Sequence, residues 1–170
     1  MRTTAIILAA STALVACATV EKVEKNEDIT AYKTVGEWQI AVSRKAGPGC
    51  VAIRHFVNPT SEVQMGINAT STPPTGFFAI FVQGYEGIEP GQSIPATFEL
   101  GTQVYKGTFT GLQEKGYGGA SVAVKDPEVV YHVIDSDSMT ITYGADRRVI
   151  VPLEDADAAI AALRECQAGL

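Results

Sequence analysis

The sequence has few of the residues that usually carry catalysis, metal binding or contacts with nucleic acid. Its 170 residues include two histidines, three cysteines and one tryptophan, with 13 Lys and Arg against 19 Asp and Glu. The formal charge of −6 disfavours nucleic acid as a partner, because phosphate binding needs clustered positive charge. The same acidic balance disfavours direct adhesion of the protein surface to anionic lipid.

Motifs for common catalytic and metal sites are also missing. His55 and His132 have no cysteine or carboxylate at metal-ligand spacing, so we predict a structural role for each. There is no Gly-x-Ser-x-Gly elbow, and the glycines of residues 116–119 lack the Lys-Ser/Thr of a phosphate loop. Residues 135–140 begin like a calcium loop but end on Thr where that loop needs Gly. We therefore predict no catalytic residue, no metal and no cofactor.

The N-terminus contains a short apolar run after a basic start. Ala5 to Ala16 gives about 12 residues against the roughly 20 that cross a bilayer, which predicts a signal peptide. Leu14-Val15-Ala16-Cys17 at its end resembles the lipobox of bacterial lipoproteins. We expect residues 1–16 to be removed and Cys17 to carry the lipid, which holds a protein at a membrane when two or more acyl chains are present.

Two localisations follow from this start. Ala18, and not an Asp, follows Cys17. In the best-known envelope sorting system this would direct a lipoprotein outward, so we expect the periplasmic face of the outer membrane. Ala16-Cys17-Ala18 also fits ordinary signal cleavage, which would release a soluble periplasmic protein. The next residues are charged and lack apolar periodicity, so we expect residues 17–33 to form a lipidated N-terminus and flexible tether. Residues 34–170 are long enough for one domain.

Once Cys17 is acylated, Cys50 and Cys166 are the only candidates for an internal disulfide in an oxidising compartment. The loop closed would hold about 115 residues, for which the chain-entropy model gives about 4–5 kcal/mol of stabilisation. Two buried free thiols, or pairing with another protein, are the alternatives.

Alternation of apolar and polar residues predicts a chain of short strands. We therefore expect a mainly β (α+β) fold, either an antiparallel β-sandwich or a partly open barrel. Residues 111–119, rich in glycine, are expected to form a loop. The predicted strands are Trp38–Val42, Cys50–Val57, Val63–Ile67, Phe77–Val82, Ile94–Leu100, Val104–Thr110, Ala120–Val124, Ser138–Tyr143 and Val149–Val151.

Two helices are predicted among these strands. Asp126-Pro127-Glu128 is a strong helix start and introduces a short helix that ends near Asp135. Asp155 is expected to cap an alanine-rich C-terminal helix. One stripe of that helix is apolar and would direct Cys166 toward the sheet; its members are Ala159, Ile160, Leu163, Cys166 and Gln167.

Several short sequence features occur in order along the chain. They are Gly36 and Trp38, Gly49 and Cys50, the strand Ser138-Met139-Thr140-Ile141 followed by arginines, Pro152-Leu153, and a terminal helix ending in Leu163-x-x-Cys166. As a set they resemble the invasion-associated locus B family, over about Tyr32 to Gln167. The resemblance implies a small, exported, mostly β domain of an alphaproteobacterial envelope, with no defining catalytic motif. The lipobox departs from the plain signal peptide of many relatives.

We therefore predict a non-enzymatic envelope lipoprotein that presents a binding surface to another envelope protein or to cell-wall material. The alternative is a periplasmic hydrolase or small-molecule binder, which should show a deep pocket with convergent polar groups. Tyr85 and Tyr117 lie in glycine-rich connections and are the candidate binding residues. Trp38 lies at the inward phase of its strand, which predicts a place in the core.

Overall fold

The computed structural model describes residues 28–44, 49–57, 60–84, 87–114, 116–144 and 147–170. Its strands are β1 (Ile29–Val35), β2 (Trp38–Ser43), β3 (Gly49–Val57), β4 (Thr60–Asn68), β5 (Thr75–Gln83), β6 (Ser93–Leu100), β7 (Gln103–Glu114), β8 (Tyr117–Val124), β9 (Ser138–Tyr143) and β10 (Arg147–Pro152). Within these ranges, no helix combines the length and apolar character needed to span a bilayer.

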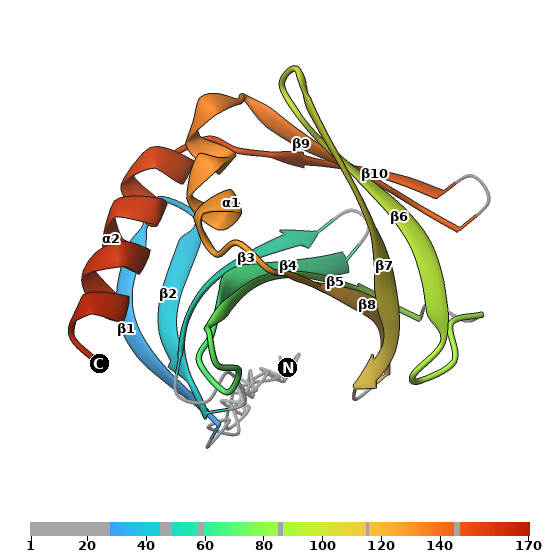
Figure 1. Ribbon diagram of the computed structural model, residues 1–170, viewed down its shortest axis with the longest axis horizontal. Helices are drawn as coiled ribbons and strands as arrows, with labels where there is room; N and C mark the ends of the chain where they lie inside the picture. The colour runs from blue at the N-terminus through green and yellow to red at the C-terminus, as the bar shows by residue number, and fades with distance from the viewer. Residues whose placement is uncertain (1–27, 45–48, 58–59, 85–86, 115, 145–146) are drawn as a thin grey trace, which may run out of the picture.

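All ten strands belong to one antiparallel sheet, in the order β1-β2-β3-β4-β5-β8-β7-β6-β9-β10. The first five strands lie side by side in chain order, whereas the second half of the sheet runs back from β8 to β6 before it reaches β9. Figure 1 shows that the sheet curls until β9 and β10 lie across from β4 and β5. The sheet stays open between its two edge strands, β1 and β10. The predicted mainly β fold, in its form of a partly open barrel, is confirmed.

Two short helical segments and one longer helix accompany the sheet. They are α1 (Glu128–Tyr131), η2 (His132–Asp135) and α2 (Ala156–Ala168). The backbone N–H of Glu128 donates to Asp126 Oδ1 at 3.0 Å, so Asp126 caps the start of α1 as its residue type predicts. The longer helix packs against β1, β2 and β3, which confirms the predicted C-terminal helix.

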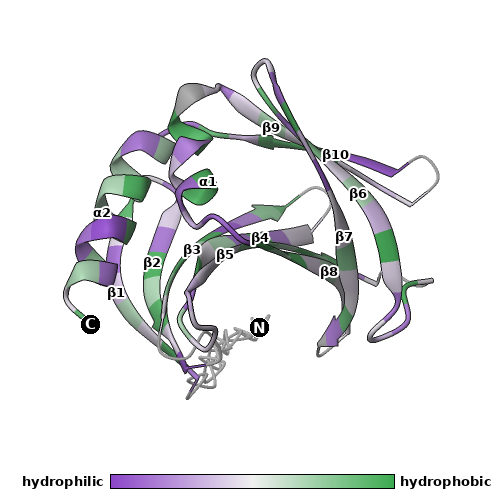
Figure 2. Ribbon diagram, viewed as in Figure 1, coloured by the Kyte–Doolittle hydropathy of each residue, from purple (hydrophilic) through white to green (hydrophobic). Residues whose placement is uncertain are grey.

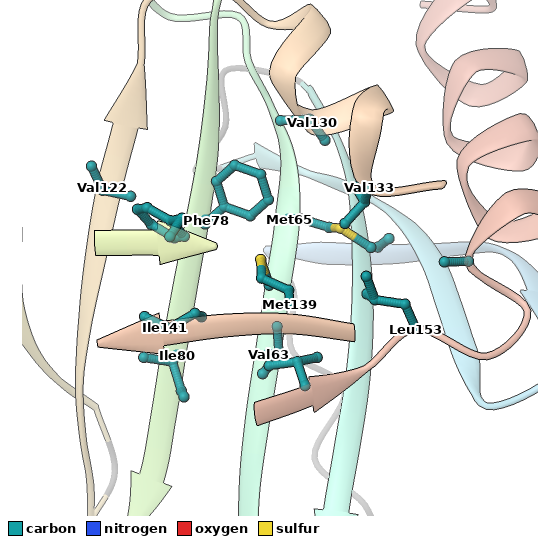
Figure 3. Close-up of a cluster of buried hydrophobic side chains, with 14 of the residues drawn as sticks. Val63, Met65, Phe78, Ile80, Val122, Val130, Val133, Met139, Ile141 and Leu153 are labelled. Carbon is teal, nitrogen blue, oxygen red and sulfur yellow. The ribbon is translucent and has the colours of Figure 1, made fainter. Parts of the chain in front are cut away.

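The main core lies on the inner face of the sheet, which is the face turned toward the helices and toward the opposite strands. Residues alternate between green and purple along many strands in Figure 2, as expected for strands with one buried face. Figure 3 shows Met65 and Phe78 from β4 and β5 directed toward Met139 and Ile141 from β9. The largest fully buried side chains are Trp38, Phe78, Phe109, Ile40, Met65, Ile80, Met139, Ile141, Ile160, Leu163, Val51 and Val63.

The last residues of the predicted tether form a strand instead. Residues 29–33, assigned to the tether, belong to β1, which pairs along its length with β2. Five of the seven residues of β1 are exposed, because an edge strand with little packing on either face needs no alternating apolar pattern. Pairing with the backbone of β2, and not hydrophobic periodicity, therefore creates this strand.

The expected glycine-rich loop over residues 111–119 is also wrong. β7 runs to Glu114 and β8 begins at Tyr117, so nearly all of the segment is sheet. A Cβ at Gly119 would collide with the carbonyl oxygen of Ile80 on the neighbouring strand β5. Here glycine permits a close backbone approach within the sheet, a role that composition alone does not separate from that of a loop residue.

Candidate functional site

Arg54 is the most connected buried polar residue described. Its Nη1 donates to the Pro152 carbonyl oxygen at 2.7 Å and to Glu154 Oε2 at 3.0 Å, and its Nη2 donates to Glu37 Oε2 at 3.0 Å. The Arg54 side chain is 8% exposed, whereas the two glutamates are mostly in solvent. Arg54 therefore joins β3 to the turn between β1 and β2, to the end of β10 and to the segment between β10 and α2.

Aromatic rings surround the same guanidinium. The Cζ atom of Arg54 lies 5.6 Å from the ring centroid of Trp38 and 5.2 Å from that of Phe56. Cation–π contacts of this kind strengthen when water is excluded. Arg54 Nε is buried and has no hydrogen-bond partner among the described residues. We call Glu37, Trp38, Arg54, Phe56, Pro152 and Glu154 the Arg54 cluster.

Trp38 and the turn between β1 and β2 also contact the segment just before α2. Trp38 is fully buried, as predicted, and its Nε1 donates to the carbonyl oxygen of Glu154 at 3.0 Å. Gly36 has φ +54°, and a Cβ there would collide with the carboxylate of Asp155. Asp155 is the N-cap of α2 as expected, although its side chain makes no capping hydrogen bond and lies over Gly36 instead.

A disulfide lies beside the cluster. Cys50 and Cys166 are bonded, with their Cα atoms 6.1 Å apart, and both are at least 98% buried. The backbone N–H of Cys50 also donates to Gln167 Oε1 at 3.0 Å. The predicted bridge between the second predicted strand and the terminal helix is confirmed, and the alternatives of free or separately paired thiols are excluded in this structure.

Several of the residues that carried the family resemblance meet at this one place in the fold. Gly36 forms the turn, Trp38 binds the backbone before α2, and Pro152 accepts the hydrogen bond from Arg54. The two cysteines join the same strand to the same helix. These marks therefore describe how the domain closes, and they say little about what it binds.

The sequence analysis gave Arg54 no role. The signal was present, because Cys50, Ala52 and Phe56 share the face of Arg54 and a lone cation at inward phase implies a buried, paired charge. Its partners lie 17 to 100 positions away along the chain, so only the fold reveals them.

Two hydrogen bonds stabilise the charged form of Glu154. A bond to its own backbone N–H, and after that the bond from Arg54, lower the pKa of Glu154 below its ordinary value of 4.5. All polar contacts of the guanidinium point to structural partners. The Arg54 cluster is therefore built to hold the domain closed, and its cation is not free to bind an anionic ligand.

The two histidines lie apart from each other and from the cluster. His55 is exposed on the outer face of β3, where its Nδ1 lies 3.4 Å from Glu62 Oε2. His132 begins η2 and is exposed. Across the described ranges, no three His, Cys, Asp or Glu side chains gather closely enough to hold a metal ion.

The other predicted site residues fall in different places. Tyr117 is half-buried at the first position of β8, paired with Gln83 of β5, and so is less exposed than its glycine-rich context suggested. Tyr85, the second candidate binding residue, and Cys17, the predicted lipidation site, lie outside the residues that the structure describes.

A hollow of 510 Å³ lies where the ends of β6 and β9 meet η2. It is lined by Glu99, Gly101, Ile134, Ser136, Asp137, Ser138 and Thr140. Ser136 Oγ is buried there without a hydrogen-bond partner in the described part of the chain. Sites for organic ligands are mostly apolar with a few placed polar groups, and this lining has mainly hydroxyls and carboxylates. The hollow can hold water or a polar group, but it lacks the apolar walls of a typical ligand site.

Comparison with known proteins supports the fold. The crystal structure of Invasion associated protein b from Bartonella henselae matches with a TM-score of 0.54, covering 81% of this chain and 99% of that one. The two sequences are 14% identical over the match, so the likeness establishes a shared fold. No family model matches the sequence, and a search of curated proteins also found no match. The resemblance inferred from the sequence thus has a structural counterpart.

Proposed function

We propose that this chain is an exported envelope protein, anchored by lipid on Cys17, whose β domain is a non-enzymatic binding module. The membrane attachment would lie at the periplasmic face of the outer membrane. The partner would be another envelope protein or cell-wall material. Host interaction is a further proposal, taken from the printed name of the Bartonella henselae protein with the same fold.

The observation that carries the proposal is the buried disulfide between Cys50 and Cys166. Such bonds form and persist in oxidising compartments and are rare in the cytosol. A short apolar run followed by a lipobox-like sequence at the N-terminus supports the same route of export.

A binding role is favoured over catalysis by how the polar groups are used. Buried Arg54 is committed to hydrogen bonds that join β3 to the start of α2. His55 is exposed, and its Nδ1 lies 3.4 Å from Glu62 Oε2 at the surface. General acid–base catalysis uses a group aligned with a reacting atom, whereas these contacts join elements of the fold to one another.

Lipidation is tested by growing cells with a palmitate analogue. We expect the wild-type protein to be labelled and the Cys17→Ala variant to be unlabelled. Cys166→Ala is the matched control, because it removes a different cysteine and should leave labelling intact. Equal labelling of wild type and Cys17→Ala would refute the anchor.

The binding role is tested with a photo-crosslinking amino acid placed in intact cells. We expect a discrete crosslinked product from position Tyr117 and none from Tyr32, which is an exposed tyrosine on β1. The product should be identified by mass spectrometry. If both positions gave the same pattern, or neither gave a product, the assignment of Tyr117 to a binding surface would be wrong.

The hollow beside η2 is the observation that favours the alternative, a periplasmic hydrolase or small-molecule binder. Asp137 and Glu99 supply its carboxylates, and Ser136 Oγ is without a described partner. A broad substrate screen would decide between the two functions. Turnover by the wild type that is lost in Asp137→Asn and kept in Asp157→Asn, a change at an exposed position of α2, would overturn the binding module.

A further inference from the structure

Exposed apolar side chains gather around the hollow beside η2. Six large hydrophobic side chains are well exposed in the described ranges, and three of them, Val104, Ile134 and Ile150, border this hollow. They are 58%, 48% and 59% exposed. Single exposed apolar residues are ordinary on a protein surface, whereas a group at one place marks an interaction site. We call these three residues the apolar rim.

Backbone pairing places two rim residues in one row with the lining of the hollow. Ile150 of β10 pairs with Thr140 of β9. Thr140 pairs with Glu99 of β6, which pairs in turn with Val104 of β7. Ladder partners share a face, and Met139, next to Thr140, belongs to the core, so the row lies on the outer face of the sheet. Neighbouring strands are about 4.8 Å apart, so this row is roughly 14 Å long, with an apolar residue at each end.

The centre of this surface is acidic and lacks a partner. Glu99 and Asp137 line the hollow, and neither carboxylate is paired with a lysine, arginine or histidine among the described residues. Ser136 lines it too, and its Oγ is buried without a hydrogen-bond partner in the same part of the chain. Buried polar atoms normally have partners, so this hydroxyl beside two unpaired carboxylates indicates a place for a hydrogen-bond donor.

The cations of the same face lie outside the hollow. Thr97 and Thr142 form the next row of the ladder, and their partners at its two ends are Lys106 of β7 and Arg148 of β10. Successive rows on one face of a strand are about 7 Å apart. The negative charge is therefore confined to the hollow, and apolar side chains border it.

We propose that the hollow and the apolar rim dock a segment of a partner protein, which inserts a lysine or arginine side chain into the hollow. The basic group binds Glu99 and Asp137 and donates to Ser136 Oγ, and apolar residues beside it in the partner pack on the rim. An arginine has five N–H donors, enough for all three acceptors. A metal ion fits less well, because no three His, Cys, Asp or Glu side chains among the described residues could hold one.

The inference rests on the proposed binding role and names a surface and a partner chemistry for it. Complementary charge steers association and excludes wrong partners, and apolar contacts around it supply area removed from water. An acidic hollow with an apolar border therefore selects a basic residue with apolar neighbours over a wholly charged segment.

Photo-crosslinking in intact cells tests the proposal on the full chain. A photo-crosslinking amino acid replaces Val104 of the rim. Val57, which is 93% exposed on β3, is the reference position, because it is an exposed apolar residue on another part of the sheet. Mass spectrometry identifies the product and the segment of the partner that carries the link.

The yield from the rim position is compared in matched backgrounds. Glu99→Gln with Asp137→Asn removes the charge of the hollow. Asp157→Asn with Glu165→Gln is the control, because it removes two exposed carboxylates from α2. Ile150→Ser tests the rim. The urea midpoint of each variant shows whether it folds, and Glu99→Gln alone is the milder variant should the double change disturb folding.

We expect a discrete product from Val104 and none from Val57, with the link close to a lysine or arginine of the partner. Loss of both carboxylates should lower the yield about tenfold, because the bound cation loses its charged partners. Ile150→Ser should lower the yield by a smaller factor, and the control should leave it unchanged.

A product that persists without the two carboxylates, or a linked segment without a basic residue, would overturn the proposal. A product with twice the mass of the chain would overturn it as well, and would assign the surface to a second copy. If Val104 gave no product while Tyr117 gave one, this surface would be wrong and the binding module would stand. The absence of a product from both positions would count against both proposals.

Discussion

The two halves of the sheet are held together by different interactions. The half from β1 to β5 has both helices packed against it, and it contains the disulfide and the Arg54 cluster. The half from β8 to β10 is joined by backbone ladders and by a row of rings. In that row the ring centroids of Phe98 and Phe109 lie 5.2 Å apart and those of Phe109 and Tyr143 lie 6.1 Å apart. Phe78 of β5 meets the row from the first half, with its ring centroid 5.2 Å from that of Phe98.

This difference follows from chain connectivity. The terminal helix must return to strands formed more than 100 residues earlier, and that contact is secured by a covalent bond and a buried cation. In the second half, β6 pairs with β7 and β9, so Phe98 and Phe109 lie on neighbouring strands and their rings meet without a long return. The contact between α2 and the early strands therefore relies on a covalent bond and on hydrogen bonds. The contacts among β6, β7 and β9 rely on backbone pairing and apolar packing.

Removal of the disulfide should have the largest effect on stability. The Cys50→Ala, Cys166→Ala double variant should lose about 4–5 kcal/mol in free energy of unfolding, because the loop that the bond closes is long. Urea denaturation measures the loss. Each single variant should match the double one, since either change breaks the bond. Hydrogen exchange should show α2 and β3 opening before β6 and β9. Simultaneous opening of both halves would contradict the comparison.

The second largest loss of stability should come from a cavity in the row of rings, in the half of the sheet from β8 to β10. Phe98 is 3% exposed, and Phe98→Ala should cost about 3–4 kcal/mol through lost burial and an unfilled cavity. Phe98→Leu, which keeps much of the volume, serves as the control and should cost clearly less in the same denaturation experiment. Hydrogen exchange should rise first in β6, β7 and β9. A first rise in α2 would show that the two halves are not separate.

Loss of the buried cation should have a moderate effect. Arg54→Met keeps an apolar stem but removes hydrogen bonds to Pro152 and to two carboxylates, for a cost of about 2 kcal/mol. The cost stays moderate because the glutamates left behind are exposed to water and remain solvated. Glu37→Gln, the control, should change the unfolding free energy by less than about 1 kcal/mol. A larger loss in Glu37→Gln than in Arg54→Met would contradict this account.

The smallest expected effect depends on pH. The folded-state pKa of Glu154 is lowered, so its contribution to stability is present above the ordinary pKa of 4.5 and disappears as pH falls through the folded value. Urea midpoints of wild type and Glu154→Gln should therefore differ most at neutral pH and converge in acid. The difference should be smaller in an Arg54→Met background, where only the bond to the backbone N–H of Glu154 remains to lower its pKa. A difference that grows in acid would have the wrong sign.

Sequence reasoning predicted well wherever the signal was local. Alternation placed β2, β3 and β9 within one residue or so of their observed bounds, and Asp126 indicated the start of α1. It failed on β1, whose residues lack alternation because both of its faces are largely exposed. It also failed around Gly119, which lies inside a strand because a neighbouring carbonyl comes too close for a side chain.

The candidate site was only partly predictable for the same reason. The cysteine pair followed from counting, because two thiols leave one internal pairing. From the sequence, Arg54 could be recognised only as a charged residue on the same strand face as apolar residues, and its partners could not be predicted. The burial of Val51 and Ile53, on the face of β3 opposite the main core, was not predicted from the sequence.

By itself, the sequence determined the strand-rich character, the two helices and the single internal disulfide that its cysteine count permits. The tertiary structure alone decided which segments meet: Arg54 binds the carbonyl oxygen of Pro152, and Trp38 binds that of Glu154, just before α2. The physical reason is that periodicity and capping are properties of neighbours along the chain. Hydrogen-bond partners and burial depend on segments that the curl of the sheet brings together.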